Sequence, residues 1–176
     1  MGQKVNPISF RTGVVRSWAS RWYADGREYG KLLIEDIKLR KALSQKLDIA
    51  GLQNIEIERL PRAMAIRIWV SRPGVVIGRG GQGIEDIKRF ILEVIGKSKK
   101  TGDKEPKIEI IVEEVKNPDL SARLVSQRIV SELERRMPQR RVVNKTLERV
   151  MASGAKGIKV LLAGRIGGAE IARREK

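Results

Sequence analysis

The chain has 176 residues, with 37 Lys and Arg against 21 Asp and Glu, a formal net charge of +16, and no Cys or His. The absence of Cys and His excludes disulfides, thiolate nucleophiles, imidazole bases and zinc sites built from these side chains, so most enzyme classes lose their usual residues. A basic excess of this size favours an anionic partner, with nucleic acid as the first candidate and an anionic membrane as the second. No apolar run approaches the roughly 18 residues of a membrane span, and the N-terminus lacks a signal-peptide core, so we expect an intracellular chain.

Residues 1–27 are basic and irregular in composition, and we predict that they form an arm or a partly packed extension. Their cations and aromatic residues include Lys4, Arg11, Arg16, Arg21, Arg27, Trp18, Trp22 and Tyr23. A helix is predicted over residues 28–47, because apolar residues recur there at helical spacing. The face expected to pack inward consists of Leu33, Ile37, Leu43 and Leu47. The adjacent carboxylates Glu35 and Asp36 are interpreted as surface residues.

The period of the apolar residues changes to two over residues 54–70, which predicts a β-hairpin with one buried face and a turn at Leu60-Pro61-Arg62. A short helical step, a glycine loop and a helix from about Gly83 to Gly96 follow. The apolar stripe of that helix consists of Ile84, Ile87, Ile91, Val94 and Ile95. A polar, solvated loop is predicted up to Lys107, and a third strand over residues 107–115.

A second α/β unit is predicted beyond Lys116. Asn117-Pro118-Asp119 has the composition of a helix start, and the helix is expected to run to about Arg136. Its inward residues are predicted to be Ala122, Val125, Ile129 and Leu133. A second helix should follow Pro138 and end at Ser153-Gly154, before an alternating strand through Ile158, Val160 and Leu162. A final short helical stretch is predicted from Ala169 to Arg174.

The loop GRGGQG, Gly78 to Gly83, matches the dinucleotide-binding pattern G-x-G-x-x-G. That fold needs a buried strand before the first glycine and an acidic residue after the next strand, and neither is found at the required place here. The shorter pattern Gly78-Arg79-Gly80-Gly81 is G-x-x-G, which in KH domains lets the backbone approach RNA phosphates. The apolar residue before the loop, the cation within it and the helix after it favour this interpretation. A tight turn that binds nothing remains the alternative.

A second candidate site lies in a basic run of the second unit. Its cations are Arg135, Arg136, Arg140, Arg141, Lys145 and Arg149, with Glu148 as the one acid among them. Arg141, Lys145 and Arg149 should project from one side of a helix. The opposite, packed side is expected to hold Val143, Leu147, Val150 and Met151. Because a solvated helix face usually mixes both signs of charge, nucleic-acid contact is favoured over plain solubility.

Several stretches together resemble the bacterial-type small-subunit ribosomal protein S-three family. They are MGQKVNP, FRTGVVRSW, RPGVVIGRGGQGIE, NPDLSARLVSQRIVSELERRM and GAKGIKVLLAGRIGGAEIARRE. The resemblance runs along nearly the whole chain. It implies an α+β / α/β fold, with a basic extension at 1–27 and a type-two KH domain at 28–115, in the order helix-strand-strand-helix-helix-strand. A second α/β domain at 116–176 would follow. Since the family normally continues past the EIAR segment, we expect that domain to be C-terminally truncated.

The resemblance also implies a function. Family members are structural, non-enzymatic proteins of the head of the small ribosomal subunit, bind its ribosomal RNA and lie at the entrance of the messenger RNA channel. Within RRMPQRRVVNKTLERV, the cations that match those at the channel are Arg140, Arg141 and Lys145. This chain has Gln139 and Asn144 where other members often have Phe and Lys. Neighbouring head proteins ten and fourteen are implied as partners, in a cytoplasmic or organellar ribosome.

The sequence therefore predicts RNA contacts at two sites and at several single cations elsewhere in the chain. The G-x-x-G loop contributes Gly78, Arg79, Gly80 and Gly81, and the basic helix contributes Arg140, Arg141 and Lys145. Further candidates are Lys4, Arg11, Arg136, Arg149 and Arg165. No cofactor, metal, membrane or small-molecule substrate is expected. A free KH-type RNA chaperone and a dinucleotide enzyme are the alternative functions.

Overall fold

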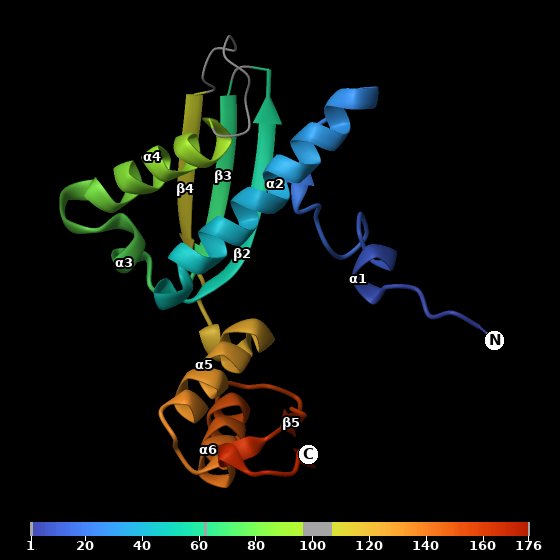
Figure 1. Ribbon diagram of the computed structural model, residues 1–176, viewed down its shortest axis with the longest axis vertical. Helices are drawn as coiled ribbons and strands as arrows, with labels where there is room; N and C mark the ends of the chain where they lie inside the picture. The colour runs from blue at the N-terminus through green and yellow to red at the C-terminus, as the bar shows by residue number, and fades with distance from the viewer. Residues whose placement is uncertain (1, 62, 97–106, 176) are drawn as a thin grey trace. The chain divides into compact units, whose positions relative to one another are not determined.

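A computed structural model describes residues 2–61, 63–96 and 107–175 (Figure 1). The chain divides into two compact units, Met1–Glu114 and Val115–Lys176. The solvated loop predicted before Lys107 and residue Arg62 of the predicted turn lie outside the described residues. No helix within the described ranges is long and apolar enough to cross a membrane.

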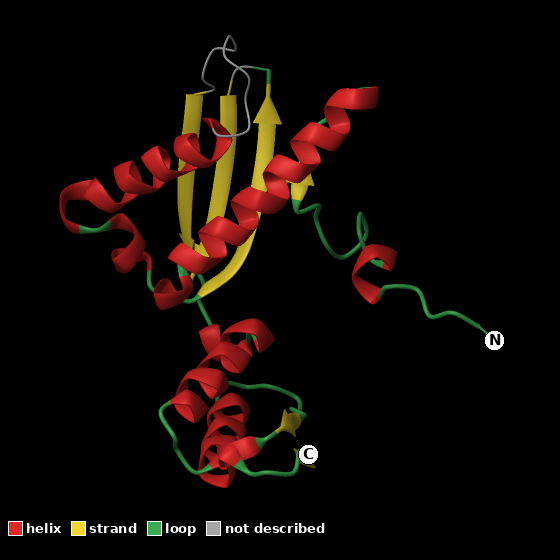
Figure 2. Cartoon of the chain, in the orientation of Figure 1, coloured by secondary structure: helices red, strands yellow, loops and turns green. Residues whose placement is uncertain are grey.

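The first unit is a four-stranded sheet with helices on one side (Figures 1 and 2). The strands are β1 Ser20–Arg21, β2 Leu52–Leu60, β3 Ala63–Val70 and β4 Lys107–Glu114, in that spatial order. The pair β2–β3 is antiparallel, whereas β1 and β4 run parallel to their neighbours. The main helices are α2 Gly26–Lys46, α3 Pro73–Ile77 and α4 Gln82–Gly96, with a short turn of helix at η1 Asp48–Ala50. The order α2-β2-β3-α3-α4-β4 confirms the predicted type-two KH arrangement.

The core of this unit is the helix-facing side of the sheet. Its strand residues are Ile55, Ile57, Met64, Ile66, Ile68 and Val70, which are buried as the period of two predicted. They pack against Leu39 and Leu43 of α2 and the stripe Ile87, Ile91 and Ile95 of α4. Ile108, Ile110 and Val112 of β4 complete this layer. The hairpin, the α4 stripe and the third strand are therefore confirmed.

The predicted inward face of α2 is partly wrong. Leu43 and Leu47 are buried as predicted, but Leu33 is 40% exposed and Ile37 is 57% exposed, and Asp36 and Leu39 are buried in their place. Both sets are spaced by about one helical turn, so spacing alone could not choose between them. The interpretation of Glu35 and Asp36 as surface residues is also wrong, because both carboxylates are buried against Arg59 of β2.

The N-terminal extension is attached to the sheet at one place. It contains a single turn of helix, α1 Pro7–Phe10, which the Asn6 side chain caps by accepting from the Ile8 amide at 2.9 Å. Residues 2–19 are exposed apart from Thr12. Only at β1 does the chain join β2, with Ser20 opposite Ile57. The sequence indicated partial packing but not this fourth strand.

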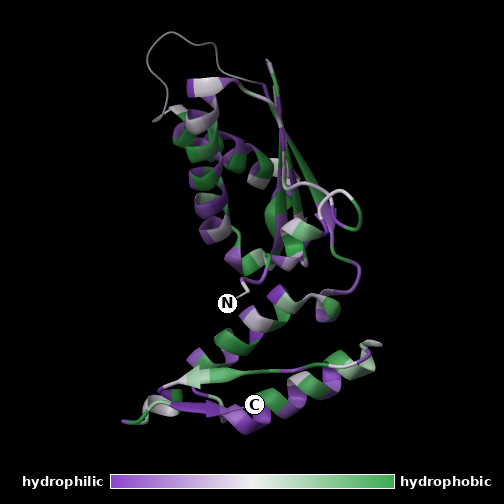
Figure 3. Cartoon of the chain, turned by 90° about the vertical axis from the view of Figure 1, so that its right-hand side faces the viewer, coloured by the Kyte–Doolittle hydropathy of each residue, from purple (hydrophilic) through white to green (hydrophobic). Residues whose placement is uncertain are grey.

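The second unit contains two helices and a two-stranded sheet. Its elements are η3 Pro118–Leu120, α5 Ala122–Glu134, α6 Gln139–Ala152, β5 Leu162–Gly164, η4 Ile166–Gly168 and β6 Arg173–Glu175. Val125, Ile129, Val142 and Val150 form its small core, against which Ile158, Val160 and Leu162 pack. In the hydropathy colouring, hydrophobic segments of both helices are visible among hydrophilic ones (Figure 3).

Three predictions for the second unit need correction. Asn117-Pro118-Asp119 begins a 3-10 turn and α5 starts after it, so Ala122 is exposed and Leu124 is buried instead. The regular strand starts only at Leu162, although Ile158 and Val160 do pack inward. The helical stretch Ala169–Arg174 is wrong: residues 173–175 pair with β5 as a strand. Pairing with β5 satisfies backbone groups that an isolated turn of helix would leave to water, and this outweighs local helix propensity.

Candidate nucleic-acid interface

The G-x-x-G loop is a tight connection between α3 and α4. Gly78, Gly80 and Gly81 all have positive φ values of 69°, 62° and 82°. This left-handed region disfavours side chains with a Cβ, so the loop geometry explains why glycine occupies these positions. Arg79, between them, is exposed, Val76 anchors α3 in the core, and Ile77 is 38% exposed. The loop thus offers an accessible backbone, one cation and the N-terminal end of α4, a combination that suits a phosphate.

Gly83, the last glycine of GRGGQG, is needed for packing. A Cβ at this position would lie 2.4 Å from the Val76 carbonyl oxygen and 2.9 Å from that of Ile77, both of them backbone atoms. Gly83 therefore lets the first turn of α4 approach the end of α3 closely. The third glycine of the apparent dinucleotide pattern has this helix–helix contact as its physical reason.

Substituting this glycine should destabilise the first unit. We expect Gly83→Ala to lower the free energy of unfolding by about 1–3 kcal/mol, because the backbone of α3 must shift to admit the methyl group. Gly30→Ala in α2 is the matched control: nothing lies within 4 Å of its Cβ, so it should stabilise the helix by about 0.5–1 kcal/mol. Urea denaturation followed by tryptophan fluorescence measures both. A neutral Gly83→Ala variant would contradict the close approach of the helices.

Helix α6 carries the second candidate site. Val142, Thr146 and Val150 form its buried side, and the Thr146 hydroxyl donates to the Val142 carbonyl oxygen at 2.7 Å. The predicted packed side is thus rotated from the observed one: Val143 and Leu147 are only half-buried and Met151 is 49% exposed. The four cations Arg140, Arg141, Lys145 and Arg149 are all exposed.

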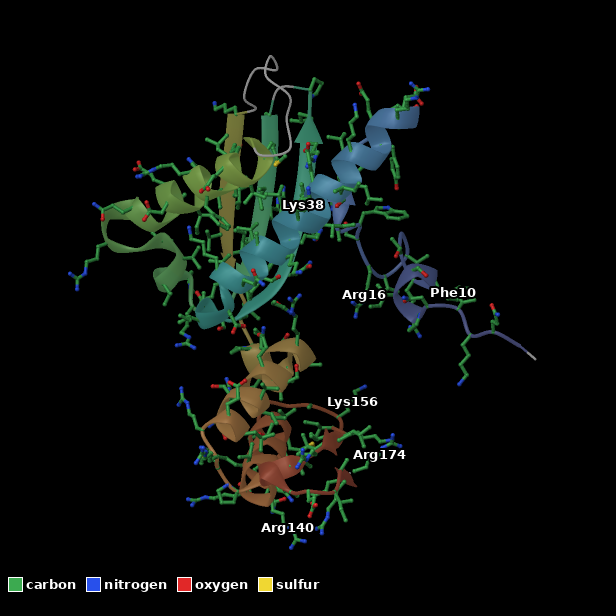
Figure 4. The ribbon with its side chains drawn as sticks, in the orientation of Figure 1. Phe10, Arg16, Lys38, Arg140, Lys156 and Arg174 are labelled. Carbon is green, nitrogen blue, oxygen red and sulfur yellow. The ribbon has the colours of Figure 1, made fainter. Side chains whose placement is uncertain are left out.

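The structure divides these cations into two groups. Arg141, Lys145 and Arg149 follow one another at i, i+4 and i+8 and form a row along α6; this row is called the basic row below. Arg140 lies about 100° away around the helix axis. It borders an open cleft of about 330 Å³ whose other lining residues are Val143, Asn144, Val160, Leu162 and Glu175. Figure 4 shows Arg140 extending outward from α6.

The electrostatic setting of α6 favours an anion. Within residues 107–175 no ion pair engages Arg140 or any cation of the basic row. The first turn of the helix has no acidic residue and Pro138 precedes it, so the positive end of the helix dipole faces two arginines. Each such cation costs roughly 0.3–1 kcal/mol unless a negative group is nearby. Gln139 is engaged elsewhere, since its amide donates to Glu175 at 2.7 Å.

The single cations predicted to contact RNA differ in whether their side chains make hydrogen bonds within the protein. Arg136 is exposed and lies just beyond the C-cap of α5 with φ 60°, the one non-glycine residue with positive φ among those described. Glycine is favoured at such a backbone angle by about 1 kcal/mol or more, so an arginine there suggests a use for its charge. Arg165 donates to the Ala169 carbonyl oxygen at 2.8 Å and Arg11 to that of Pro7 at 3.2 Å, although both side chains stay exposed. Lys4 is exposed.

Sequence reasoning missed a buried polar cluster in the first unit. Arg59 pairs with Glu35 at 3.0 Å and with Asp36 at 2.6 Å, and its side chain is 11% exposed. A signal was available, because Arg59 shares the alternation of Ile55 and Ile57 and so faces the helices. Nearby, burial lowers the pKa of Arg40, an effect opposed by the negative charges of Asp36 and Glu56.

Comparison with known proteins agrees with both units. Residues 38–120 match the model of the KH domain family, and residues 129–176 match that of "Ribosomal protein S3, C-terminal domain". The chain is 45% identical over 175 residues to the small ribosomal subunit protein uS3 of Desulfatibacillum aliphaticivorans, covering 99% of this chain and 76% of that protein. The chain belongs to the uS3 family.

Two further uS3 proteins give similar values. That of Persephonella marina is 43% identical, with 99% of this chain and 74% of the relative covered, and that of Clostridium acetobutylicum is 44% identical, with 100% and 76% covered. The uS3 family is structural and not enzymatic, which confirms the prediction of a non-enzymatic, RNA-binding ribosomal protein. The G-x-G-x-x-G stretch lies within the residues that match the KH domain family.

Proposed function

We propose that this chain is a structural constituent of the head of the small ribosomal subunit, where it binds ribosomal RNA and borders the entrance of the messenger RNA channel. The basic row carries this proposal: three exposed cations at helical spacing that no ion pair engages among the described residues. A protein that kept these charges only for solubility would be expected to interleave acids with them.

RNA binding at the basic row works through phosphate neutralisation. Consecutive cations along one helix side are spaced by about 6 Å, close to the spacing of phosphates along a single strand, so one strand can contact several of them. The unpaired cations in the first turn of α6 gain additional stabilisation when a phosphate approaches the helix N-terminus. No covalent chemistry is required.

At the channel entrance, these cations would hold incoming message and favour its single-stranded form. Of the cations implied by the family resemblance, Arg141 and Lys145 belong to the basic row, whereas Arg140 lies on the other flank of α6. We infer that Arg140 and the basic row contact different phosphates. Strand separation would follow because cations on two flanks bind a splayed strand better than a compact duplex.

The G-x-x-G loop is proposed as a second RNA contact. Arg79 and the exposed backbone of Gly78, Gly80 and Gly81 would approach phosphates of ribosomal RNA. Arg136, Arg149 and Arg165 would add charge in the second unit, and Lys4 and Arg11 in the N-terminal extension. Head proteins ten and fourteen are the proposed protein neighbours in a cytoplasmic ribosome.

The salt dependence of RNA affinity tests this function. Binding of the full chain to a small-subunit ribosomal RNA transcript should weaken linearly in log K against log salt concentration. The variant Arg141→Gln, Lys145→Gln, Arg149→Gln should lower that slope by about 2, at roughly 0.7–0.9 per lost phosphate contact. Arg79→Gln should lower it by less than 1.

A matched control carries the same loss of charge elsewhere. Lys31, Lys38 and Lys41 are exposed on α2, and their replacement by Gln should change the slope by clearly less than the basic-row variant. Equal slopes for the two triple variants would show diffuse attraction and contradict the site. If the endogenous protein failed to sediment with the small subunit at moderate salt, the ribosomal assignment itself would fail and a free RNA chaperone would be favoured.

A further inference from the structure

The N-terminal extension is held to the KH sheet by one buried carboxylate on α2. Asp36, 2% exposed, accepts from the Trp22 indole nitrogen at 2.8 Å and from the Ser20 hydroxyl at 3.1 Å. Trp22 also contacts the ring of Tyr29 at a centroid distance of 5.3 Å. Two side chains of the extension therefore converge on a single acceptor group.

Arg40, one helical turn after Asp36, also binds residues 19 and 20 of the extension. Its guanidinium donates to the Ala19 carbonyl oxygen at 2.6 Å and to the Ser20 hydroxyl at 2.8 Å. The Ile57 amide also donates to the Ala19 carbonyl oxygen at 3.1 Å. Residues 19–22 are thus clasped between α2 and the edge of β2.

The need to neutralise the charge of Arg59 does not by itself explain why a second carboxylate, that of Asp36, is buried beside it. Glu35 already pairs with the Arg59 guanidinium at 3.0 Å. Asp36 Oδ1 accepts from Arg59, whereas Oδ2 accepts from Trp22 and Ser20, so one oxygen of this carboxylate is devoted to the extension.

Beyond this clasp the extension is basic and exposed. Its exposed cations are Lys4, Arg11 and Arg16. Figure 4 shows Phe10 and Arg16 on the segment that leads away from the sheet. Because residues 2–18 are almost entirely exposed, their position depends on the attachment at residues 19–22.

We propose that Asp36, assisted by Arg40, is a positioning residue that fixes the N-terminal extension at the edge of the KH sheet and presents its cations to RNA in one place. The inference rests on the proposed RNA-binding function and names a residue that acts without touching RNA. Fixing the attachment point in advance reduces the entropy that binding must otherwise remove.

The test uses the full chain and alters the clasp from the side of the extension. The double variant Ser20→Ala, Trp22→Phe removes both donors to Asp36 Oδ2 and leaves the pairs of Arg59 intact. Limited trypsin digestion after Arg21, which lies within the attached segment, should become about tenfold faster, because that segment opens more often. Tyr23→Phe, at a neighbouring exposed aromatic residue, should digest at the wild-type rate.

RNA binding separates positioning from charge. With a small-subunit ribosomal RNA transcript, the double variant should bind about three- to tenfold more weakly with an unchanged salt slope, since every cation is retained. Lys4→Gln, Arg11→Gln should instead lower the slope by about 1 to 2. Asp36→Asn should also release the extension, with an added loss of stability because the Arg59 guanidinium loses a charged partner.

Unchanged digestion of the double variant would overturn the proposal. So would unchanged RNA affinity in a double variant that digests faster, provided that Lys4→Gln, Arg11→Gln weakens binding. If Lys4→Gln, Arg11→Gln bound RNA as tightly as the wild type, the extension would have no role in RNA binding and the proposal would be wrong. The proposed RNA contact of the basic row would not be affected, because its own triple variant tests it.

Discussion

Charge reversal at Arg140, Arg141 and Lys145 is expected to slow translation through structured messages strongly while leaving unstructured messages much less affected. These cations are exposed on α6 and no ion pair engages them in the described part of the second unit. Exposed charge pairs contribute roughly 0.2–1 kcal/mol each. Losing three of them and adding repulsion should therefore reduce the affinity for a message strand by about ten- to a hundredfold.

The variant should fold normally, which makes the result interpretable. Arg140 and Arg141 lie in the first turn of α6, where a cation opposes the helix dipole. Arg→Glu at these positions is expected to stabilise the helix, by about 0.3–1 kcal/mol per site. A loss of activity accompanied by an unchanged or raised melting temperature would then be assigned to lost contacts.

The measurement compares ribosomes that contain only the variant or only the wild-type chain. Each is given messages that differ solely in a hairpin placed downstream of the start. We expect the delay at the hairpin to increase severalfold in the variant. Lys31→Glu, Lys38→Glu, Lys41→Glu on α2 is the control with the same charge change. Equal slowing on both messages would remove the assignment to the channel entrance.

Removing the charge of Arg59 is expected to have the largest effect on stability. Arg59→Met leaves the carboxylates of Glu35 and Asp36 buried without their cation. Breaking a buried charge pair from one side typically costs about 3–5 kcal/mol, a large part of the roughly 5–15 kcal/mol by which domains are stable.

Urea denaturation can follow the first unit alone, because Trp18, Trp22 and Trp69 are the chain's three tryptophans and all precede residue 115. Arg67→Met is the matched control: it lies in β3, half-buried and without an ion pair among the described residues. It should change stability by no more than about 0.5 kcal/mol. A loss below about 1 kcal/mol for Arg59→Met would contradict the buried cluster.

A triple variant connects this cluster to the N-terminal extension. Glu35→Gln, Asp36→Leu, Arg59→Met replaces the buried charges together, and such replacements are often neutral or stabilising. We expect the triple variant to recover much of the stability lost by Arg59→Met. Because the leucine at position 36 of this variant cannot accept a hydrogen bond from Trp22, trypsin should digest its extension faster than that of the wild type, as in the Ser20→Ala, Trp22→Phe variant.

Much of the first unit could be predicted from its sequence, because the signals are local. Alternation over residues 54–70 identified the hairpin and its buried face, and the stripe Ile87, Ile91 and Ile95 identified the inward side of α4. The glycines at 78, 80 and 81 predicted a loop whose backbone angles favour glycine. The exposure of the α6 cations was also predictable, since an unpaired run of like charge is costly to bury.

The remaining features depend on partners distant in the chain. Two apolar stripes compete for the inward face of α2, and the observed one brings Asp36 to Arg59, whose charge needs a partner once β2 buries it. Residues 173–175 form a strand because β5 lies beside them, although their local composition suits a helix. On α6, the packing of Val160, Leu162 and Glu175 beside the helix is what places Arg140 at a cleft.

Local patterns in the sequence were enough to predict the KH order of elements, the loop that can approach phosphates and the basic character of α6. Packing between distant segments places Arg140 at the cleft and selects Asp36 as the carboxylate that holds the N-terminal extension. The spacing of apolar residues along an element indicates which of its sides faces the core and which faces solvent. The pairing of one element with another depends on burying charges and backbone groups together, which no single segment of the sequence specifies.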